Sequence, residues 1–129
     1  MLILYLFYSS NIFELFNGIT FLCYHAIMRT LFHPNRSEIQ LTAVLYALSD
    51  PIRLSMVKTL AGGNELNCGA FDLSIAKSTL SHHFKVLRES GVIEIRLEGR
   101  QRLISLRTAN LDERFPGLLK SILTATKPF

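Results

Sequence analysis

The spacing of apolar residues changes abruptly at Gly91, and this change constrains the fold of the chain more than any other feature. Before Gly91, apolar residues recur three or four positions apart, as on one face of a helix: Leu80, Phe84 and Leu87. After it, apolar and polar residues alternate from Ile93 to Glu98, which is the pattern of a half-buried strand. Glycine also suits the left-handed position that ends many helices. The sequence therefore predicts a helix to about Ser90, followed at once by a strand.

A hairpin and the start of the preceding helix follow from the neighbouring residues. Glu98-Gly99 is a turn signal, and residues 100–107 are suited to a returning strand. Upstream, Ala76-Lys77 indicates a tight turn. The hydroxyl of Ser78 would then cap the helix that runs to Ser90.

Three further helices are expected before this turn. Residues 38–48 carry one apolar helical face: Leu41, Val44, Leu45 and Leu48. Asp50-Pro51 indicates the start of a helix over residues 51–61. The carboxylate of Asp50 can cap this helix, and Pro51 suits its first turn. The residues expected to be buried there are Ile52, Met56, Val57 and Leu60. A short helix over residues 70–75 would add two apolar contacts, Phe71 and Leu73.

These elements together predict the fold class. The short helices before the turn at Ala76-Lys77 and the helix after it, which has a polar, basic face, form a helix-turn-helix pattern. The hairpin after it makes the prediction a winged helix-turn-helix, a mainly α fold with a β-hairpin wing (α+β). In the tail, Asn110–Glu113 resembles a capping box, and Pro116 would begin the last helix at its first position. That last helix carries an apolar stripe of Leu118, Leu119, Ile122 and Leu123.

The composition of the chain changes near Met28. Residues 1–27 contain no Lys or Arg and one acid, Glu14, but they hold seven of the 13 aromatic residues. The rest carries all 14 basic residues against nine acids, a net charge of +5. Three interpretations of residues 1–27 stay open: codons upstream of a true start at Met28, an N-terminal membrane anchor, or an extra packed helix. Residues 28–129 are expected to form one domain, with a membrane as partner only if the first segment is translated and inserts.

Three stretches within residues 28–129 resemble the ArsR/SmtB-type bacterial transcriptional repressors. They run from Ala47 to Leu54, from Ser78 to Ile93 and from Arg96 to Arg100. The stretches are specific in combination, and the resemblance extends over about residues 38–124. It implies a homodimer whose first and last helices pair across the two-fold axis, a palindromic operator, and an inducer, often a metal ion, that releases DNA. The two cysteines of the chain are in keeping with a reducing compartment, the cytoplasm.

A basic cluster lies in the predicted helix-turn-helix and wing. Residues 77–107 hold seven of the 14 basic residues against three acids. A solvated surface normally mixes charges of both signs, whereas binding phosphates requires cations. His83, beside Leu80 and Leu87, is expected to be a partly buried structural residue. The expected DNA-binding residues, from the exposed helix side and the wing, are Lys77, Ser78, Thr79, Ser81, His82, Lys85, Arg88, Arg96, Arg100 and Arg102.

The first and last helices carry more apolar surface than one small core can use, which predicts a homodimer. The expected dimerisation residues are Leu41, Val44, Leu45, Leu118, Leu119 and Ile122.

Metal sensing is not expected, and no cofactor is predicted. Metal-responsive members of the family that the chain resembles carry a Cys-x-Cys pair on the third helix, or Asp, His and Glu ligands on the last. Here the first region has Cys68 alone and the last helix has no His. Cys68 is a candidate redox residue if the start of a helix stabilises its thiolate. The simpler interpretation is a small structural cysteine.

No arrangement of residues typical of catalysis occurs in the chain, so an enzyme is not expected. Two functions stay open. One is a sequence-specific DNA-binding transcriptional regulator, a homodimeric repressor released by an unknown signal. The other is a winged-helix protein-interaction module without specific DNA binding. The basic face favours the first, because an interaction module does not need cations on both helix and wing.

Overall fold

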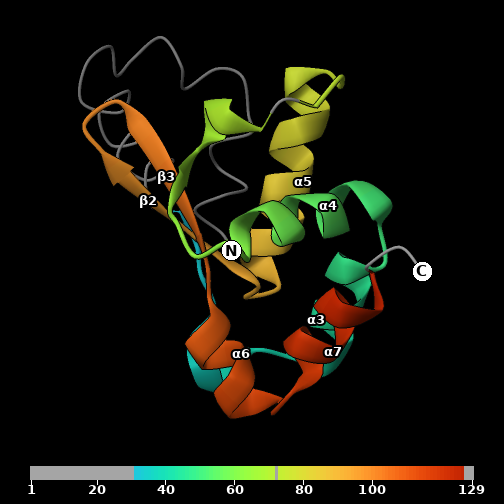
Figure 1. Cartoon of the computed structure of the whole chain (residues 1–129). Helices are drawn as coiled ribbons and strands as arrows, with labels where there is room; N and C mark the ends of the chain where they lie inside the picture. The colour runs from blue at the N-terminus through green and yellow to red at the C-terminus, as the bar shows by residue number, and fades with distance from the viewer. Residues whose placement is uncertain (1–30, 72, 127–129) are drawn as a thin grey trace, which may run out of the picture. The chain divides into compact units, whose positions relative to one another are not determined.

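The order of elements along the chain is that of a winged helix (Figure 1). The computed structural model describes residues 31–71 and 73–126, so the expectations for residues 1–27 lie outside the described residues. Residues 32–126 belong to one compact unit. Its helices are η1 (Arg36–Glu38), α3 (Leu41–Leu48), α4 (Pro51–Leu60), η2 (Cys68–Ala70), α5 (Lys77–Glu89), α6 (Thr108–Arg114) and α7 (Leu118–Ala125). Its strands are β1 (Leu66–Asn67), β2 (Ile93–Glu98) and β3 (Gln101–Leu106).

The transition from helix to strand at Gly91 is confirmed. Gly91 has a φ of +83°, and its N–H donates to the carbonyl of Arg88 at 3.0 Å. The N–H of Val92 donates to the carbonyl of Leu87, also at 3.0 Å. This pair of bonds is the Schellman arrangement that satisfies the last carbonyls of a helix. It turns the chain directly into β2.

The predicted hairpin is also confirmed. Strands β2 and β3 are antiparallel, with Ile95 opposite Ile104 and Glu98 opposite Gln101. The turn has two central residues, and Gly99, the first of them, has a φ of +60°. This is the position that type II′ turns reserve for glycine. Among the described residues, β1 joins the hairpin as a third strand on the far side of β3.

The start of α4 follows the predicted chemistry. One carboxylate oxygen of Asp50 accepts hydrogen bonds from the backbone N–H groups of Ile52 and Arg53, at 2.9 and 3.0 Å, and Pro51 occupies the first turn. Ile52 is half-buried rather than buried, because Arg53 takes the inward position beside it. The guanidinium of Arg53 donates to the carbonyls of Ala47 and Tyr46, at 2.6 and 3.0 Å, and so joins α3 to α4.

The predicted helix over residues 70–75 is wrong. Upstream, Leu66 and Asn67 pair with β3, and the short turn η2 ends at Ala70. After it, the N–H groups of Leu73 and Ile75 donate to carbonyls only two positions back, those of Phe71 and Leu73, at 3.0 and 2.7 Å, instead of the four positions of an α-helix. The Asn67 side chain accepts a hydrogen bond from the N–H of Gly69 at 3.0 Å and caps the single 3-10 turn η2. Phe71 is nevertheless buried as expected, edge-on to Phe84 with ring centroids 5.3 Å apart.

Four helix starts differ from the prediction. α5 begins at Lys77 after an extended Ala76, so Ser78 lies inside the helix and is not its cap. α6 begins at Thr108, because the N–H of Leu111 already donates to the carbonyl of Arg107; the capping box at Asn110 is therefore absent. α7 begins after Gly117, whose left-handed φ of +76° separates Pro116 from the helix. α3 starts at Leu41, three residues later than expected.

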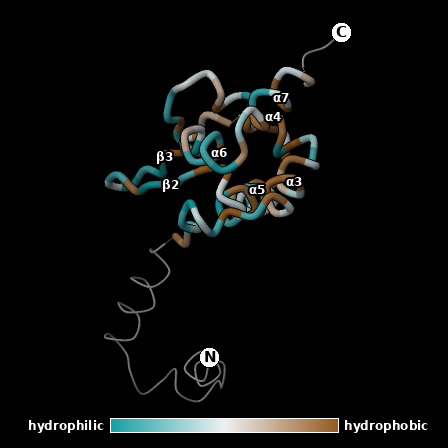
Figure 2. The backbone as a smooth tube through the Cα atoms, turned by 90° about the horizontal axis from the view of Figure 1, so that it is seen from below, coloured by the Kyte–Doolittle hydropathy of each residue, from teal (hydrophilic) through white to brown (hydrophobic). Residues whose placement is uncertain are grey.

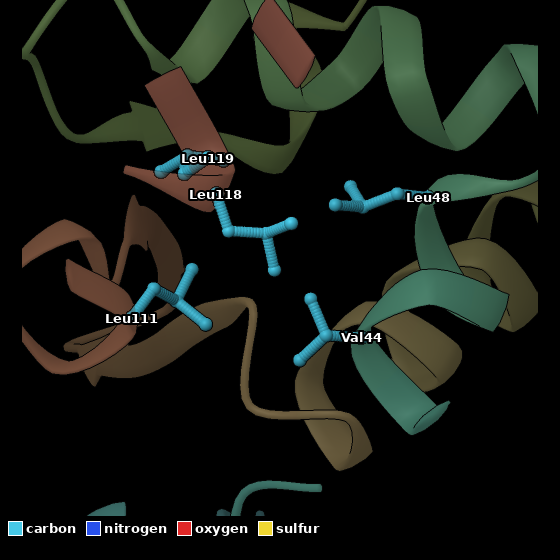
Figure 3. A pocket seen from close by; sticks show the side chains of 5 residues that line it. All are labelled: Val44, Leu48, Leu111, Leu118 and Leu119. Atoms are coloured by element: carbon cyan, nitrogen blue, oxygen red, sulfur yellow. The ribbon is translucent and has the colours of Figure 1, made fainter. Parts of the chain in front are cut away.

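The core lies where α3, α4, α5 and the inner face of the sheet meet. Its largest fully buried side chains include Ile39, Met56, Leu60, Leu87, Ile93 and Ile104. A second contact joins the first and last helices of the fold: Figure 3 shows side chains from α3, α6 and α7 converging on one small apolar space, which is too narrow for a water molecule. They are Val44, Leu48, Leu111, Leu118 and Leu119. Over the described residues, no helix has the length and apolar character needed to cross a bilayer.

Candidate nucleic-acid interface

Helix α5 has two opposite faces, each with residues at positions i, i+3, i+4 and i+7. On the inner face, His83, Phe84 and Leu87 are buried and Leu80 is half-buried. On the outer face, all four residues are exposed: Ser78, Ser81, His82 and Lys85. Lys77 and Thr79 are exposed beside them at the start of the helix. The helix therefore presents a continuous polar face with a cation, as a helix placed in a DNA groove requires.

The start of α5 has free capacity for an anion. Ala76 is the N-cap and makes no side-chain capping bond. The first backbone N–H groups of α5 thus have no side-chain acceptor from the N-cap residue, and the positive end of the helix dipole lies behind them. Phosphate oxygens commonly bind at such a position.

The hairpin projects from the helices and is mostly hydrophilic along its outer part (Figure 2). Arg100 stands in the turn, and Arg102 follows on β3; both are exposed. Leu97 is exposed on the same outer part. The outer part of the wing therefore carries two exposed arginines.

Arg96 was expected beside them, but its guanidinium has partners within the chain. Two of its nitrogens donate to the carboxylate of Glu65, at 2.7 and 2.6 Å, and a third lies 3.3 Å from Glu98. The hydrogen bond from Arg96 holds the pKa of Glu65 below its ordinary value of 4.5. Arg96 thus ties β2 to the segment before β1, and its charge is compensated.

Arg88 is likewise turned toward the protein, although its helical position suggested an exposed contact. Its side chain is 13% exposed, and Nε donates to the backbone carbonyl of Phe32 at 3.0 Å. Nη2 lies 3.5 Å from the carboxylate of Glu89. The structure therefore separates Arg88 from the exposed cations Lys77, Lys85, Arg100 and Arg102.

The two adjacent histidines have different surroundings, as predicted. His82 is exposed on the outer face of α5, whereas His83 is 7% exposed on the inner face. The Nδ1 atom of His83 is buried and has no hydrogen-bond partner among the described residues. His83 is thus a core residue, and His82 alone of the two is placed for contact with a ligand.

The six expected dimerisation residues divide into two groups. Leu41 and Leu45 are 43% and 44% exposed on α3, and Leu118 and Ile122 are half-buried on α7. Val44 and Leu119, at 1% and 4% exposed, belong to the contact between α3 and α7 within one chain. Because that contact buries both side chains, the expectation that they face a partner is corrected. Tyr46, which was not anticipated, is 64% exposed on α3.

Cys68 does not have the surroundings of a reactive thiol. Burial raises the pKa of Cys68 above its ordinary value, and the charge of Arg102 opposes this only in part. The helix that was expected to stabilise a thiolate is the single 3-10 turn η2, which is too short for an appreciable dipole. Within residues 31–71 and 73–126, no three His, Cys, Asp or Glu residues gather in a way that could hold a metal ion.

Two structural residues of this region were missed in the sequence. Arg53 lies in the stretch that resembles the repressor family, and its position three residues after Asp50 could have drawn attention to it. Glu65 carries no such signal, because it meets Arg96 from 31 positions away.

Comparison with known proteins agrees with this architecture. The family described as "Bacterial regulatory protein, arsR family" matches residues 50–94, from the start of α4 into β2. An uncharacterised HTH-type transcriptional regulator, YceK of Bacillus subtilis, is 38% identical over 91 residues, which cover 67% of this chain and 91% of that protein. A biofilm growth-associated repressor of Xylella fastidiosa is 36% identical over 92 residues, covering 64% and 80% of the two chains.

A solved structure extends the likeness to three dimensions. The crystal structure of the transcriptional repressor BigR from Xylella fastidiosa superposes with a TM-score of 0.55 at 32% identity, covering 69% of this chain and 88% of that one. The relatives are transcriptional regulators and not enzymes. The chain belongs to the ArsR family of winged helix-turn-helix transcriptional regulators.

Proposed function

We propose that this protein is a homodimeric repressor that binds a palindromic DNA operator through α5 and the β2–β3 wing, and that a signal releases it. The observation that carries the proposal is the exposed face of α5, where Ser78, Ser81, His82 and Lys85 stand in line and the exposed wing arginines follow. A repressor of this kind acts in the cytoplasm, where the bacterial chromosome lies.

The exposed side chains divide by chemistry into two roles. Lys77, Lys85, Arg100 and Arg102 supply charge for phosphates, which gives affinity without sequence preference. Ser81 and His82 lie in the middle of the helix face and can bond to base edges in the major groove. Ser78 and Thr79, in the first turn of α5, are suited to phosphate or to the first base.

Dimerisation is proposed through apolar side chains of α3 and α7 that stay exposed or half-buried in the single chain. Leu41, Leu45 and Tyr46 project from α3, a helix of eight residues whose inner side already packs against the core. Leu118 and Ile122 stay partly uncovered on α7. A two-fold axis through this surface would pair each residue with its counterpart and would present two α5 helices to two half-sites.

The test uses a duplex that the protein selects from a pool with a randomised core. Affinity is measured for this duplex and for one of scrambled sequence, at two salt concentrations. Tighter binding to the selected duplex that weakens steeply with salt supports the proposal. A failure to enrich any duplex, with equal and weak binding to all, would instead favour a protein-interaction module. Sedimentation at micromolar concentration tests the dimer separately.

A further inference from the structure

Residues 32–34, here called the strap, cross the junction between the recognition helix and the wing. Arg88 of α5 donates from Nε to the carbonyl of Phe32 at 3.0 Å. The backbone N–H of Ile95 in β2 donates to Nε2 of His33 at 2.9 Å. Two consecutive strap residues are thus bonded to the two elements that the proposed function places on DNA.

The third residue of the strap, Pro34, is hydrogen-bonded to the residue that follows strand β3. Arg107, which follows β3, donates from Nη1 to the carbonyl of Pro34 at 2.8 Å, and Pro34 is buried. Beyond the strap, the side chain of Arg36 in η1 pairs with Glu113 of α6. The strap is therefore fixed at each of its three residues and continues into a segment that is tied to α6 as well.

The strap adds a second connection between α5 and β2. The first is the backbone itself, which passes from Glu89 to Ile93 through the left-handed Gly91. This short connection alone does not fix the angle between the helix and the hairpin, and buried side chains of both, such as Leu87 and Ile93, also pack in the core. The bonds from Arg88 and Ile95 to neighbouring strap residues further restrict that angle at a distance from the turn.

We propose that the strap sets the angle between α5 and the wing, and that Arg88 and His33 are positioning residues for DNA recognition rather than contacts with DNA. The proposal rests on the proposed DNA binding. Helix and wing must reach a groove and its flanking phosphates at the same time, so an altered angle weakens specific binding even when every contacting side chain is intact. Arg88 is suited to a positioning role because its guanidinium is already hydrogen-bonded to the carbonyl of Phe32 and paired with the carboxylate of Glu89.

The experiment separates positioning from phosphate contact by the salt dependence of binding. The full chain carries Arg88→Gln, His33→Ala or both, and is titrated with the duplex selected by the unaltered protein. Each single change is expected to weaken binding about tenfold while the slope of log affinity against log salt stays that of the unaltered protein. The double variant is expected to lose less than the product of the two factors, because both act through one segment.

Three controls accompany these variants. Lys85→Gln removes an exposed cation of the outer face from each protomer and is expected to reduce the slope by about 0.9 per protomer, about 1.8 for the proposed dimer. Ser37→Ala changes an exposed residue just beyond the strap and should alter neither affinity nor slope. Hydrogen exchange of the Ile95 amide, measured without DNA, reports on the strap directly and should become faster in Arg88→Gln and in His33→Ala.

Each outcome decides between the interpretations. A slope reduced by about 0.9 per protomer, about 1.8 for the proposed dimer, in Arg88→Gln would mean that Arg88 contacts phosphate, and would overturn the positioning role. Unchanged affinity together with unchanged Ile95 exchange in both single variants would overturn the strap itself. Failure of the unaltered protein to bind any duplex would contradict the proposed function. In that case unchanged Ile95 exchange still overturns the strap, and faster exchange supports it.

Discussion

Gly91 lies directly against the side chain of Ile39. A Cβ atom at Gly91 would stand 2.7 Å from Cγ1 and 2.9 Å from Cδ1 of Ile39, inside the distance at which carbon atoms repel. Ile39 is 1% exposed and shortly precedes α3, whereas Gly91 ends α5. The helix terminator is therefore also a packing position, and glycine is required there for two separate reasons.

Gly91→Ala is expected to be strongly destabilising, and Gly63→Ala provides a matched control. Gly63 has a similar φ of +93° but no atom within 4 Å of its would-be Cβ. Both variants incur the strain of a left-handed alanine, about 1–2 kcal/mol, and only Gly91→Ala adds the overlap with Ile39, about 1–3 kcal/mol. Urea unfolding of the two variants gives the difference. Equal reductions in the free energy of unfolding would show that the contact with Ile39 relaxes freely.

Asp50→Ala should reduce the free energy of unfolding by about 1 kcal/mol, because the backbone N–H groups of Ile52 and Arg53 lose their acceptor. Asp50→Asn keeps an acceptor oxygen and should be less destabilised. The hydrogen bond from the Arg53 backbone is the main cause that lowers the pKa of Asp50 below its ordinary value of 3.8.

A lowered pKa in the folded state fixes the sign of the pH dependence. The contribution of the Asp50 carboxylate to stability is fully present above its ordinary value of 3.8 and is lost as the pH falls through the lower, folded value. Acid unfolding curves of the unaltered protein and Asp50→Asn should therefore converge at low pH. A constant difference between them at every pH would contradict this role of the carboxylate.

Leu45→Glu should dissociate the proposed dimer and leave the fold intact, because Leu45 is exposed in the single chain. Sedimentation and circular dichroism measure the two properties. Leu119→Asp is the contrasting variant: Leu119 is buried between α3 and α7, so a carboxylate there should unfold the chain. A dimeric Leu45→Glu protein would count against the proposed surface.

Ser81→Ala and His82→Ala should change the preference among operator variants, by about 1–3 kcal/mol for each hydrogen bond to a base edge that the substitution removes. Lys85→Ala should instead weaken all duplexes alike, since a lysine offers a point charge to phosphate. Competition between the selected duplex and single-base variants distinguishes the two effects. Unchanged binding in all three variants would contradict the placement of α5 in the major groove.

Cys68 should be a poor redox sensor. Burial raises the pKa of its thiol, so little thiolate is present near neutral pH. Treatment with peroxide should leave duplex binding unchanged, and Cys68→Ser should behave like the unaltered protein. Peroxide-driven release of DNA that disappears in Cys68→Ser would establish the redox role.

Local patterns predict most of the fold, and tertiary contacts account for the errors. The alternation after Gly91 and the cap at Asp50 depend on neighbours in sequence, and both are confirmed. The composition of residues 70–75 favours a helix, but the pairing of Leu66 and Asn67 with β3 draws the preceding residues to the sheet, and only the single turn η2 follows it. No local pattern reports such a pairing.

The same limit applies to the candidate site. The exposed face of α5 follows from helical spacing, since Ser78, Ser81, His82 and Lys85 recur as on one side of a helix. Helical spacing also places Arg88 near this face, yet its carbonyl partner at Phe32 lies 56 positions away. Arginines are long enough to turn inward, so only the packed structure separates those that are free from those that are engaged.

The bond from Ile95 to His33 has a further consequence for how copies of the chain behave in a crowded cell. In the described sheet β2 lies at one edge, and its outward N–H groups could join a strand of another molecule. The imidazole of His33 occupies one of them from the side. Nε2 accepts this bond through its lone pair, so this N–H group is not available to a strand of another molecule. At this position, a side chain outside the proposed DNA-binding surface therefore protects the edge of the sheet from intermolecular strand pairing.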